Sequence, residues 1–176
     1  DCTCVFVDKI HKIVAENNDK DGTLPVLGSK THPEVIGFCS QFDGKIIVFE
    51  SLKELENAVA GGEISIDCAK SQIAVAQTTQ NLGEWEKIKK FLSNLYTNLQ
   101  IFDTICSVTE NRQLEALDLS RANDFMVVIG SKGSSNSEKL YSICKAECDE
   151  TVMIENVDEL RRFFPIFHEK VGIVAG

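Results

Sequence analysis

Two stretches of this chain carry the same pattern, and this internal repeat limits the possible folds more than any other feature of the sequence. Cys4 and Cys106 are each followed, 24 residues later, by the triplet Gly-Ser-Lys. Further along, residues 49–55 match residues 154–160, and residues 73–77 match residues 172–176. Repeats of this length predict two domains of similar fold. Since each copy carries a cysteine and then a polar cluster at equal spacing, we expect one site that both domains share.

The predicted secondary structure alternates between helices and strands in both copies. Each expected strand is a continuous apolar run, which is typical of parallel sheets that are buried on both faces. The expected strands are residues 24–27, 45–49, 72–76, 125–129, 151–154 and 171–174. The expected helices are residues 5–17, 33–41, 51–60, 83–97, 107–119, 135–146 and 157–164. The sequence therefore predicts an α/β fold with two similar domains, residues 1–103 and 104–176, each with a parallel sheet flanked by helices.

Charge and hydropathy exclude several classes of partner. The formal net charge is −9 with no basic block to offset it, which argues against nucleic acid and against anionic membranes as partners. No apolar run reaches the roughly 18 residues that a membrane span needs, and no export signal is visible, so we expect a cytoplasmic protein. The chain begins with Asp1 and stops at Gly176 after a strand-like run, and we expect both ends to be cuts through a larger protein.

The seven cysteines fall into two groups. They are Cys2, Cys4, Cys39, Cys68, Cys106, Cys144 and Cys148. An odd number without an export signal argues against a disulfide scaffold, and we interpret Cys39, Cys68 and Cys144 as small buried hydrophobic residues. Cys4 and Cys106 differ because each precedes a predicted helix, whose positive N-terminal end favours a thiolate.

Three polar clusters follow predicted strands, at residues 31–34, 77–79 and 134–136. The carboxyl ends of parallel strands share one edge of a sheet, and α/β proteins bind their ligands there. Hydroxyl, amide and imidazole groups beside helix N-termini can bind an anion such as phosphate even on an acidic protein. These clusters are therefore candidate phosphate-binding segments.

Each cluster also has a purely structural interpretation. Glu34 can complete a capping box with Thr31, and Glu138 can do the same with Ser135. His32 precedes a proline and can serve as a simple N-cap. The presence of three such clusters beside two repeat-matched cysteines favours a functional role over a structural one.

Seven short strings occur in an order that resembles one enzyme family. They are residues 1–4 (Asp-Cys-Thr-Cys), 9–12 (Lys-Ile-His-Lys), 32–35 (His-Pro-Glu-Val), 77–79 (Gln-Thr-Thr), 104–106 (Thr-Ile-Cys), 111–113 (Asn-Arg-Gln) and 130–137 (Gly-Ser-Lys-Gly-Ser-Ser-Asn-Ser). Together they resemble the LytB-type 4-hydroxy-3-methylbut-2-enyl diphosphate reductases over the whole length of this chain.

This resemblance implies a domain arrangement and a cofactor. Members of the family have three similar α/β domains, related by pseudo-threefold symmetry, around one [4Fe-4S] cluster that is held by one cysteine from each domain. The resemblance implies that Cys4 and Cys106 are two of these metal ligands and that the third belongs to a domain preceding this sequence. Val5 departs from the family pattern, which normally has proline at this position.

The resemblance also implies a substrate site and a reaction. Its diphosphate-binding residues match His32, Thr78, Ser134, Ser135 and Asn136, and its catalytic residues match Glu34, as a proton-relay acid, and Thr78. The implied reaction is a two-electron reductive removal of the allylic hydroxyl, which yields isopentenyl and dimethylallyl diphosphates in non-mevalonate isoprenoid biosynthesis. The resemblance also implies a ferredoxin- or flavodoxin-like partner that supplies the electrons. Since a third cluster ligand and a further substrate-binding serine are expected outside residues 1–176, we expect these residues alone to be inactive.

Other interpretations of the residues stay open. The two domains can form a non-catalytic module that binds a phosphate ligand, although such a module has no need of repeat-matched cysteines. They can form an iron–sulfur electron carrier, although a carrier has no need of an acid beside phosphate donors. A zinc-stabilised repeat is the third alternative, and the spacing of Cys144 and Cys148 allows it, but neither copy contains a closed set of four ligands.

Overall fold

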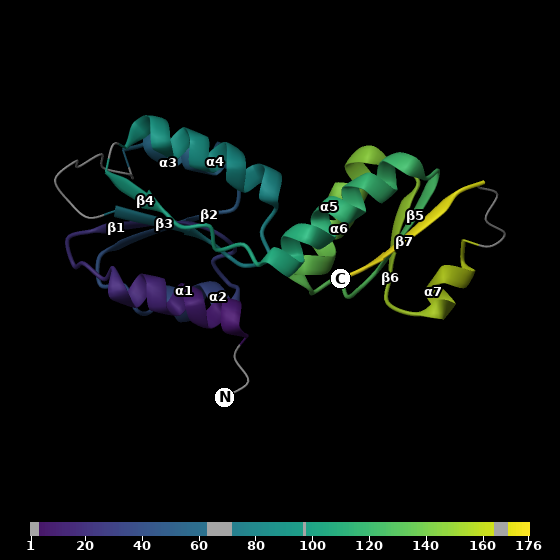
Figure 1. Ribbon diagram of the computed structural model, residues 1–176, viewed down its shortest axis with the longest axis horizontal. Helices are drawn as coiled ribbons and strands as arrows, with labels where there is room; N and C mark the ends of the chain where they lie inside the picture. The colour runs from purple at the N-terminus through teal and green to yellow at the C-terminus, as the bar shows by residue number, and fades with distance from the viewer. Residues whose placement is uncertain (1–3, 63–71, 97, 164–168) are drawn as a thin grey trace. The chain divides into compact units, whose positions relative to one another are not determined.

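The computed structural model describes residues 4–62, 72–96, 98–163 and 169–176 (Figure 1). It consists of two compact units, unit 1 (Asp1–Cys106) and unit 2 (Ser107–Gly176). Both units contain a parallel sheet flanked by helices, which confirms the predicted α/β fold class. The boundary between the units falls after Cys106, three residues beyond the position that the sequence predicts.

Unit 1 is built on a four-stranded parallel sheet with the strand order β2-β1-β3-β4. Its strands are β1 (Thr23–Leu27), β2 (Lys45–Phe49), β3 (Gln72–Ala76) and β4 (Leu99–Ile101). At the carboxyl end of β1, Leu27 lies opposite both Phe49 and Ala76. The central strands β1 and β3 are buried almost throughout, as expected for continuous apolar runs between two helical layers.

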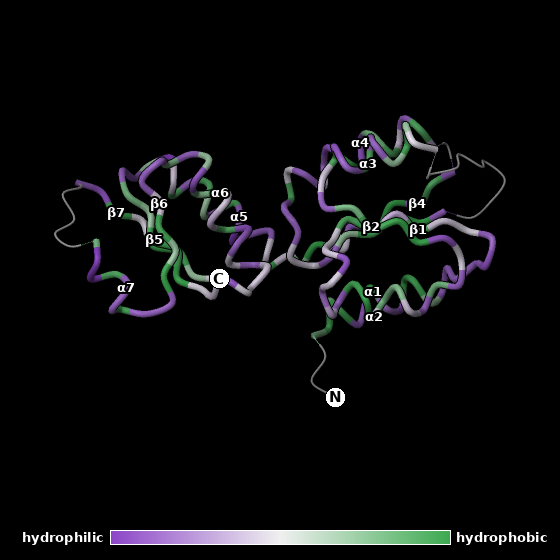
Figure 2. The backbone as a smooth tube through the Cα atoms, turned by 180° about the vertical axis from the view of Figure 1, so that it is seen from behind, coloured by the Kyte–Doolittle hydropathy of each residue, from purple (hydrophilic) through white to green (hydrophobic). Residues whose placement is uncertain are grey.

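Two helices cover each face of this sheet (Figure 1). Helices α1 (Val5–Glu16) and α2 (Pro33–Cys39) pack on one face, where Ile10 and Phe38 join a core with Val26. Helices α3 (Leu52–Ala60) and α4 (Leu82–Leu95) pack on the other face, where Trp85 joins a core with Leu27. Figure 2 shows the apolar strands of unit 1 between these two layers. The segments that follow β1 and β3 meet at the carboxyl edge of the sheet, where the N–H of Ser29 donates to the side chain of Gln77.

Unit 2 repeats this design with a three-stranded parallel sheet of order β6-β5-β7. Its elements are α5 (Ser107–Ala122), β5 (Phe125–Ile129), α6 (Ser135–Glu147), β6 (Thr151–Ile154), α7 (Val157–Arg161) and β7 (Val171–Ala175). Strands β6, β5 and β7 take the places that β2, β1 and β3 take in unit 1. The predicted repeat is therefore a repeat of structure.

Individual hydrogen bonds recur in the two units. The N–H of Gly28 donates to the carbonyl of Phe49 at 2.9 Å, and the N–H of Gly130 donates to that of Ile154 at 2.9 Å. Neither glycine leaves room for a β-carbon, because its position would fall 2.8 Å from Val35 Cγ2 at Gly28 and 2.2 Å from Ser137 Oγ at Gly130. The turn after the first strand of each unit thus passes so close to the following helix that only glycine fits.

The helix that follows the second strand begins in the same way in both units. The Ser51 side chain caps α3 by accepting from the N–H of Glu54 at 3.3 Å, as the predicted capping box requires. Asn156 caps α7 by accepting from the N–H of Glu159 at 3.0 Å. In both cases the glutamate carboxylate accepts in return from the N–H of the residue before the cap.

The units differ on one face of the sheet. In unit 1, Leu27 and Ala74 are fully buried in the core that Trp85 of α4 completes. The residues at the equivalent strand positions of unit 2, Ile129 and Ile173, are 42% and 60% exposed. Among the described residues of unit 2, no helix corresponds to α4 and no strand to β4.

Two local predictions need correction. The sequence predicts no strand at Leu99–Ile101, but β4 pairs there with β3. Helix α6 begins at Ser135, as predicted, but its N-cap is Ser134, so Ser135 is the first helical residue and not the cap of the capping box with Glu138 that the sequence allows. Across the described residues, none of the helices combines the length and apolar character that a bilayer span requires.

Candidate functional site

The predicted polar site residues of unit 1 lie where strands β1 and β3 end. The loop after β1 leads to His32, which is the N-cap of α2 and whose Nδ1 accepts from the N–H of Glu34 at 3.2 Å. A neutral imidazole that accepts at Nδ1 carries its proton on Nε2. His32 thus fills the structural role that the sequence allowed and still has a donor to offer to an anion.

Glu34 does not form the capping box with Thr31 that the sequence allows as a structural alternative, because the N-cap of α2 is His32. The Glu34 carboxylate instead accepts two hydrogen bonds from Thr78, one from the backbone N–H at 2.7 Å and one from the hydroxyl at 2.8 Å. Thr78 is buried, and Glu34 is half-buried. The pair joins the start of α2 to the segment after β3 and holds a carboxylate and an alcohol in a fixed arrangement.

Gln77 ties the two loops of this edge together. Its side chain is fully buried, and its Oε1 accepts from the N–H of Ser29 at 3.2 Å. Its Nε2 donates to the hydroxyl of Thr79 at 3.0 Å. Because buried amides satisfy their hydrogen bonds, Gln77 fixes the turn after β1 against the end of β3. Gln77 thus supports the segment that carries Thr78.

Cys106 belongs to the same framework. Its backbone N–H donates to the carbonyl of Thr78 at 3.0 Å. Its thiol is free and its side chain is half-buried. One residue, Thr78, therefore binds the carboxylate of Glu34 through its N–H and hydroxyl and the backbone of Cys106 through its carbonyl.

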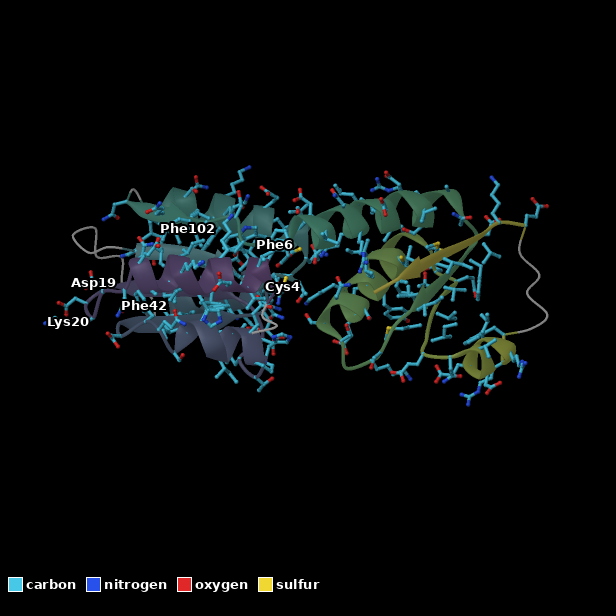
Figure 3. The ribbon with its side chains drawn as sticks, turned by 60° about the horizontal axis from the view of Figure 1, so that its bottom comes forward. Cys4, Phe6, Asp19, Lys20, Phe42 and Phe102 are labelled. Carbon is cyan, nitrogen blue, oxygen red and sulfur yellow. The ribbon has the colours of Figure 1, made fainter. Side chains whose placement is uncertain are left out.

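Cys4 lies at the start of helix α1, as predicted. It occupies the N-cap position with an extended backbone, its thiol is free and exposed, and it makes no capping hydrogen bond. Figure 3 shows Cys4 beside Phe6, at the opposite end of α1 from Asp19 and Lys20. Since α1 leads through a short turn into β1, the two run in opposite directions, and the start of α1 lies toward the carboxyl edge of the sheet.

The predicted cluster of unit 2 lies at the start of α6. Ser134 caps this helix by accepting from the N–H of Ser137 at 3.4 Å, and Ser134 and Ser135 are half-buried. The side-chain oxygen of Asn136 is buried, and no partner for it occurs among the described residues. Buried polar atoms normally have a partner, so Asn136 has hydrogen-bonding capacity that a ligand can use.

An acidic residue orders the loop that precedes this cluster. The carboxylate of Glu155 accepts from the N–H of Lys132 at 3.0 Å. This bond, together with one from the Ser131 hydroxyl, lowers the pKa of the Glu155 carboxyl below its ordinary value. Glu155 is thus held ionised against the backbone of the loop.

The donor chemistry of the two repeat-matched cysteines fits an iron–sulfur cluster, because free thiols are the ligands that such clusters use. Within the described ranges, no three His, Cys, Asp or Glu side chains come together as a possible metal site.

The other described cysteines lie in packed regions. Cys144 and Cys148 are buried in the core of unit 2, and Cys39 packs beside a core of unit 1. Burial raises the pKa of Cys39 and of Cys144 to about 11. Cys144 is buried, as interpreted from the sequence, whereas Cys39 is only half-buried beside its core, and Cys2 and Cys68 lie outside the described residues.

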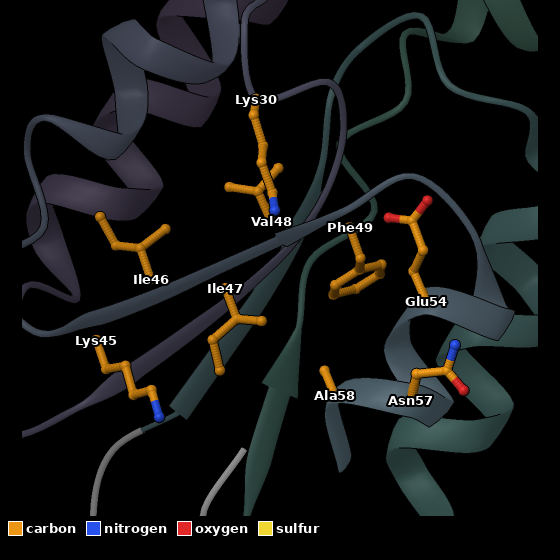
Figure 4. A pocket seen from close by; sticks show the side chains of 9 residues that line it. All are labelled: Lys30, Lys45, Ile46, Ile47, Val48, Phe49, Glu54, Asn57 and Ala58. Carbon is orange, nitrogen blue, oxygen red and sulfur yellow. The ribbon is translucent and has the colours of Figure 1, made fainter. Parts of the chain in front are cut away.

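A groove of about 630 Å³ runs along the edge strand β2 (Figure 4). It is lined by Lys30, Lys45, Ile46, Ile47, Val48, Phe49, Glu54, Asn57 and Ala58. None of the predicted site residues lines this groove. In unit 1, His32, Glu34 and Thr78 lie instead at the carboxyl edge of the sheet, where β1 and β3 end.

Comparison with known proteins relates the chain to one family. The family model described as LytB protein matches residues 1–176. A protein of Clostridium acetobutylicum named 4-hydroxy-3-methylbut-2-enyl diphosphate reductase is 42% identical over 177 residues, which cover 99% of this chain and 26% of that protein. A protein of the same name from Caldanaerobacter subterraneus is 38% identical over 176 residues, which cover all of this chain and 58% of that protein. The chain thus spans between about a quarter and three fifths of the length of these relatives.

Solved structures show the same fold. The E-1-hydroxy-2-methyl-but-2-enyl-4-diphosphate reductase of Plasmodium falciparum aligns with a TM-score of 0.83 and 24% identity, over 99% of this chain and 54% of that chain. A structure described as (E)-4-hydroxy-3-methyl-but-2-enyl diphosphate reductase aligns with a TM-score of 0.52 and 30% identity, over 99% of this chain and 60% of that chain.

Proposed function

The chain belongs to the LytB protein family, and on this premise we propose that it forms part of a 4-hydroxy-3-methylbut-2-enyl diphosphate reductase of the cytoplasm. In the proposed reaction the allylic C–O bond of the substrate breaks, two electrons and two protons enter, and water leaves together with isopentenyl or dimethylallyl diphosphate. A ferredoxin- or flavodoxin-like protein delivers the electrons.

The observation that carries this proposal is the connection between Glu34, Thr78 and Cys106. A carboxylate, a hydroxyl and a cysteine from three separate segments are joined by three hydrogen bonds of 2.7 to 3.0 Å. A reductive removal of a hydroxyl group needs an acid beside the redox centre, and the shared attachment of Glu34 and of the Cys106 backbone to Thr78 supports Glu34 in that role. A module that only binds phosphate has no use for the thiol.

Cys4 and Cys106 are the proposed ligands of a [4Fe-4S] cluster, with the remaining cysteine ligand outside the described residues. When bound, the cluster supplies the electrons of the reaction. The residues of this chain hold the substrate and move its protons. Glu34 donates a proton to the leaving hydroxyl, and Thr78 holds the carboxylate in the orientation that this transfer requires.

The proposed diphosphate ligands are polar side chains of the three clusters that follow strands β1, β3 and β5. They are the Nε2–H of His32, the hydroxyls of Ser134 and Ser135, the side chain of Asn136, and the hydroxyl of Thr78, which donates to Glu34 in this structure and has to turn from that carboxylate to donate to a phosphate oxygen. The orientation of an asparagine amide follows its partners, so the buried end of Asn136 can present its N–H₂ to a phosphate oxygen. Its lack of a partner among the described residues supports this assignment.

The test uses the full-length protein prepared without oxygen. We expect absorbance near ~400 nm, typical of a cysteine-bound cluster, and expect Cys4→Ser and Cys106→Ser to lose it. Cys39→Ala is the matched control and should keep it. A protein that stays colourless after reconstitution with iron and sulfide contradicts the assignment and favours a phosphate-binding module. A coloured protein that does not turn over the substrate favours an electron carrier.

A further inference from the structure

We propose that Thr104 is a positioning residue that holds Cys106 in register with Thr78 and Glu34. Thr104 is not among the residues that the sequence or the family resemblance assigns to the site. The inference depends on the proposed function only for the role of Cys106 as a ligand. The geometry of Thr104 itself stands without that role.

Phe102, Thr104 and Cys106 each form hydrogen bonds to strand β3 or to the segment that follows it. The N–H of Phe102 donates to the carbonyl of Ala74 at 3.0 Å, and the N–H of Cys106 donates to that of Thr78 at 3.0 Å. Between them, the hydroxyl of Thr104 donates to the carbonyl of Ala76 at 2.6 Å and accepts from its N–H at 2.8 Å. The segment from Phe102 to Cys106 therefore runs alongside the chain from Ala74 to Thr78, and Thr104 makes the middle attachment.

This middle attachment differs from the other two because a side chain makes it. The Thr104 hydroxyl binds both backbone groups of Ala76, which is fully buried, and Thr104 itself is only 4% exposed. Removing the hydroxyl leaves a buried donor and a buried acceptor without a partner, which is the costly way to lose a hydrogen bond. Water cannot readily replace it at this depth.

Asp103 and Ile105, which alternate with the residues bonded to Ala74, Ala76 and Thr78, contact side chains of unit 1. The Asp103 carboxylate accepts from the indole N–H of Trp85 at 3.0 Å and from the ammonium of Lys89 at 2.7 Å. Ile105 packs against the core that contains Trp85. The segment is thus held from both sides, and the backbone of Cys106 is fixed by unit 1.

The position of Cys106 is linked to that of Glu34 through Thr78. Cys106 and Glu34 both bind Thr78, so a shift of the segment before Cys106 changes the position of the thiol relative to the carboxylate. Thr104 acts through this shared frame. It touches neither the substrate nor the proposed cluster directly, and so we call it a positioning residue.

The test compares Thr104→Val, which has nearly the same shape without the hydroxyl, with Thr104→Ser, which keeps the hydroxyl. The metal-free chain is treated with iodoacetamide under native conditions, and mass spectrometry follows the alkylation of each cysteine. We expect Thr104→Val to raise the alkylation rate of Cys106 by about tenfold, because the segment opens locally, and to leave the rate of Cys4 unchanged. Thr104→Ser should restore the rate to within about twofold of wild type.

Ser51→Ala is the matched control, since it also removes a hydroxyl that accepts a backbone N–H in unit 1 but lies on α3. If it raises the Cys106 rate as much as Thr104→Val does, or if a folded Thr104→Val leaves that rate unchanged, the proposal is wrong. Should Thr104→Val fail to fold, amide hydrogen exchange of the wild-type chain decides instead. The Cys106 amide should be as protected as that of Ala76, and free exchange at Cys106 overturns the proposal.

These measurements are separate from the test of the proposed function. A full-length protein that stays colourless disproves the cluster but leaves the alkylation result of Thr104→Val standing. In a coloured protein, we expect Thr104→Val to lower kcat with little change in KM and to lose its absorbance faster in air. Thr104→Ser should behave like wild type in both respects.

Discussion

The Glu34 carboxylate accepts two hydrogen bonds from Thr78, a residue 44 positions further along the chain, at 2.7 Å from the N–H and 2.8 Å from the hydroxyl. Both donors come from one residue, so the carboxylate cannot turn away from Thr78 without losing both bonds. Its orientation is thereby set by the end of strand β3. A group that must transfer a proton to a bound substrate benefits from such a fixed orientation.

Replacement of Glu34 by glutamine tests its chemical role. An amide has one acceptor oxygen in place of two, and its N–H₂ cannot donate to the Thr78 N–H. We expect the free energy of unfolding to fall by about 1 kcal/mol and the turnover of the full-length protein to fall by about a hundredfold or more. Steady-state kinetics and chemical denaturation measure the two effects. Glu54→Gln, which alters a capping carboxylate on α3, is the control and should retain turnover; equal turnover in both variants would reduce Glu34 to a structural residue.

Two glycines of the same loop should respond differently to alanine. At Gly130 a β-carbon would fall 2.2 Å from Ser137 Oγ, whereas at Gly133 its nearest contact is 4.0 Å away. We expect Gly130→Ala to lower the free energy of unfolding of unit 2 by about 1–3 kcal/mol and to weaken the binding of inorganic diphosphate. Gly133→Ala should change neither quantity appreciably. Thermal unfolding and titration calorimetry of the full-length protein provide the comparison, and equal effects would show that close packing at Gly130 is not what shapes the loop.

Alkaline pH should destabilise unit 2 through Cys144. Burial raises the pKa of this thiol from 9.0 to about 11, so between these values the unfolded chain releases a proton that the folded chain retains. The contribution of the protonated thiol to stability is complete below pH 9 and is lost as the pH rises toward 11, amounting to roughly 2–3 kcal/mol. Urea unfolding at several pH values should show this decline. Cys144→Ala should flatten it, and an unchanged slope in that variant would assign the decline to other groups.

Acid should release the Asp103 attachment. The hydrogen bond from Lys89 lowers the pKa of the Asp103 carboxyl below its ordinary 3.8, so this contribution to stability is present above that value and is lost as the pH falls through the lowered pKa. Asp103 is 73% exposed, so the loss should stay below about 1 kcal/mol. Trp85, the single tryptophan of the chain, binds Asp103 and should report the change through its fluorescence. Asp103→Asn should abolish this acid transition, while Glu86→Gln, which alters the other partner of Lys89, should preserve it.

The repeat and the apolar runs were sufficient to predict most of the fold. Continuous apolar segments such as those of β2 and β5 are long enough to be recognised, and their predicted bounds are confirmed. Strand β4 escaped prediction because it has three residues, of which none is fully buried. Its pairing with β3 depends on the sheet that is already formed, and local composition carries little of that information.

The sequence predicts at which edge of the sheet the candidate site residues lie, but it does not predict which of them contact one another. Strands β1 and β3 are neighbours, with Leu27 opposite Ala76, and so the segments that follow them meet. Sequence spacing cannot reveal this adjacency, and it suggested a local cap for Glu34 in place of the long-range bond to Thr78. The spacing likewise gave no sign of the role of Thr104, which depends on the same strand order. The assignment of Cys4 and Cys106 as cluster ligands stays a prediction.

The boundary between the two sequence repeats differs from the boundary between the two structural units. In the sequence repeat Cys106 begins the second copy, but its backbone N–H is hydrogen-bonded to Thr78 in unit 1. If the two units are to be separated, or one of them exchanged between relatives, the chain should therefore be divided after Cys106, so that this cysteine stays with unit 1. A downstream piece that retains Cys106 would lose the bond from its N–H to the Thr78 carbonyl, which fixes its backbone.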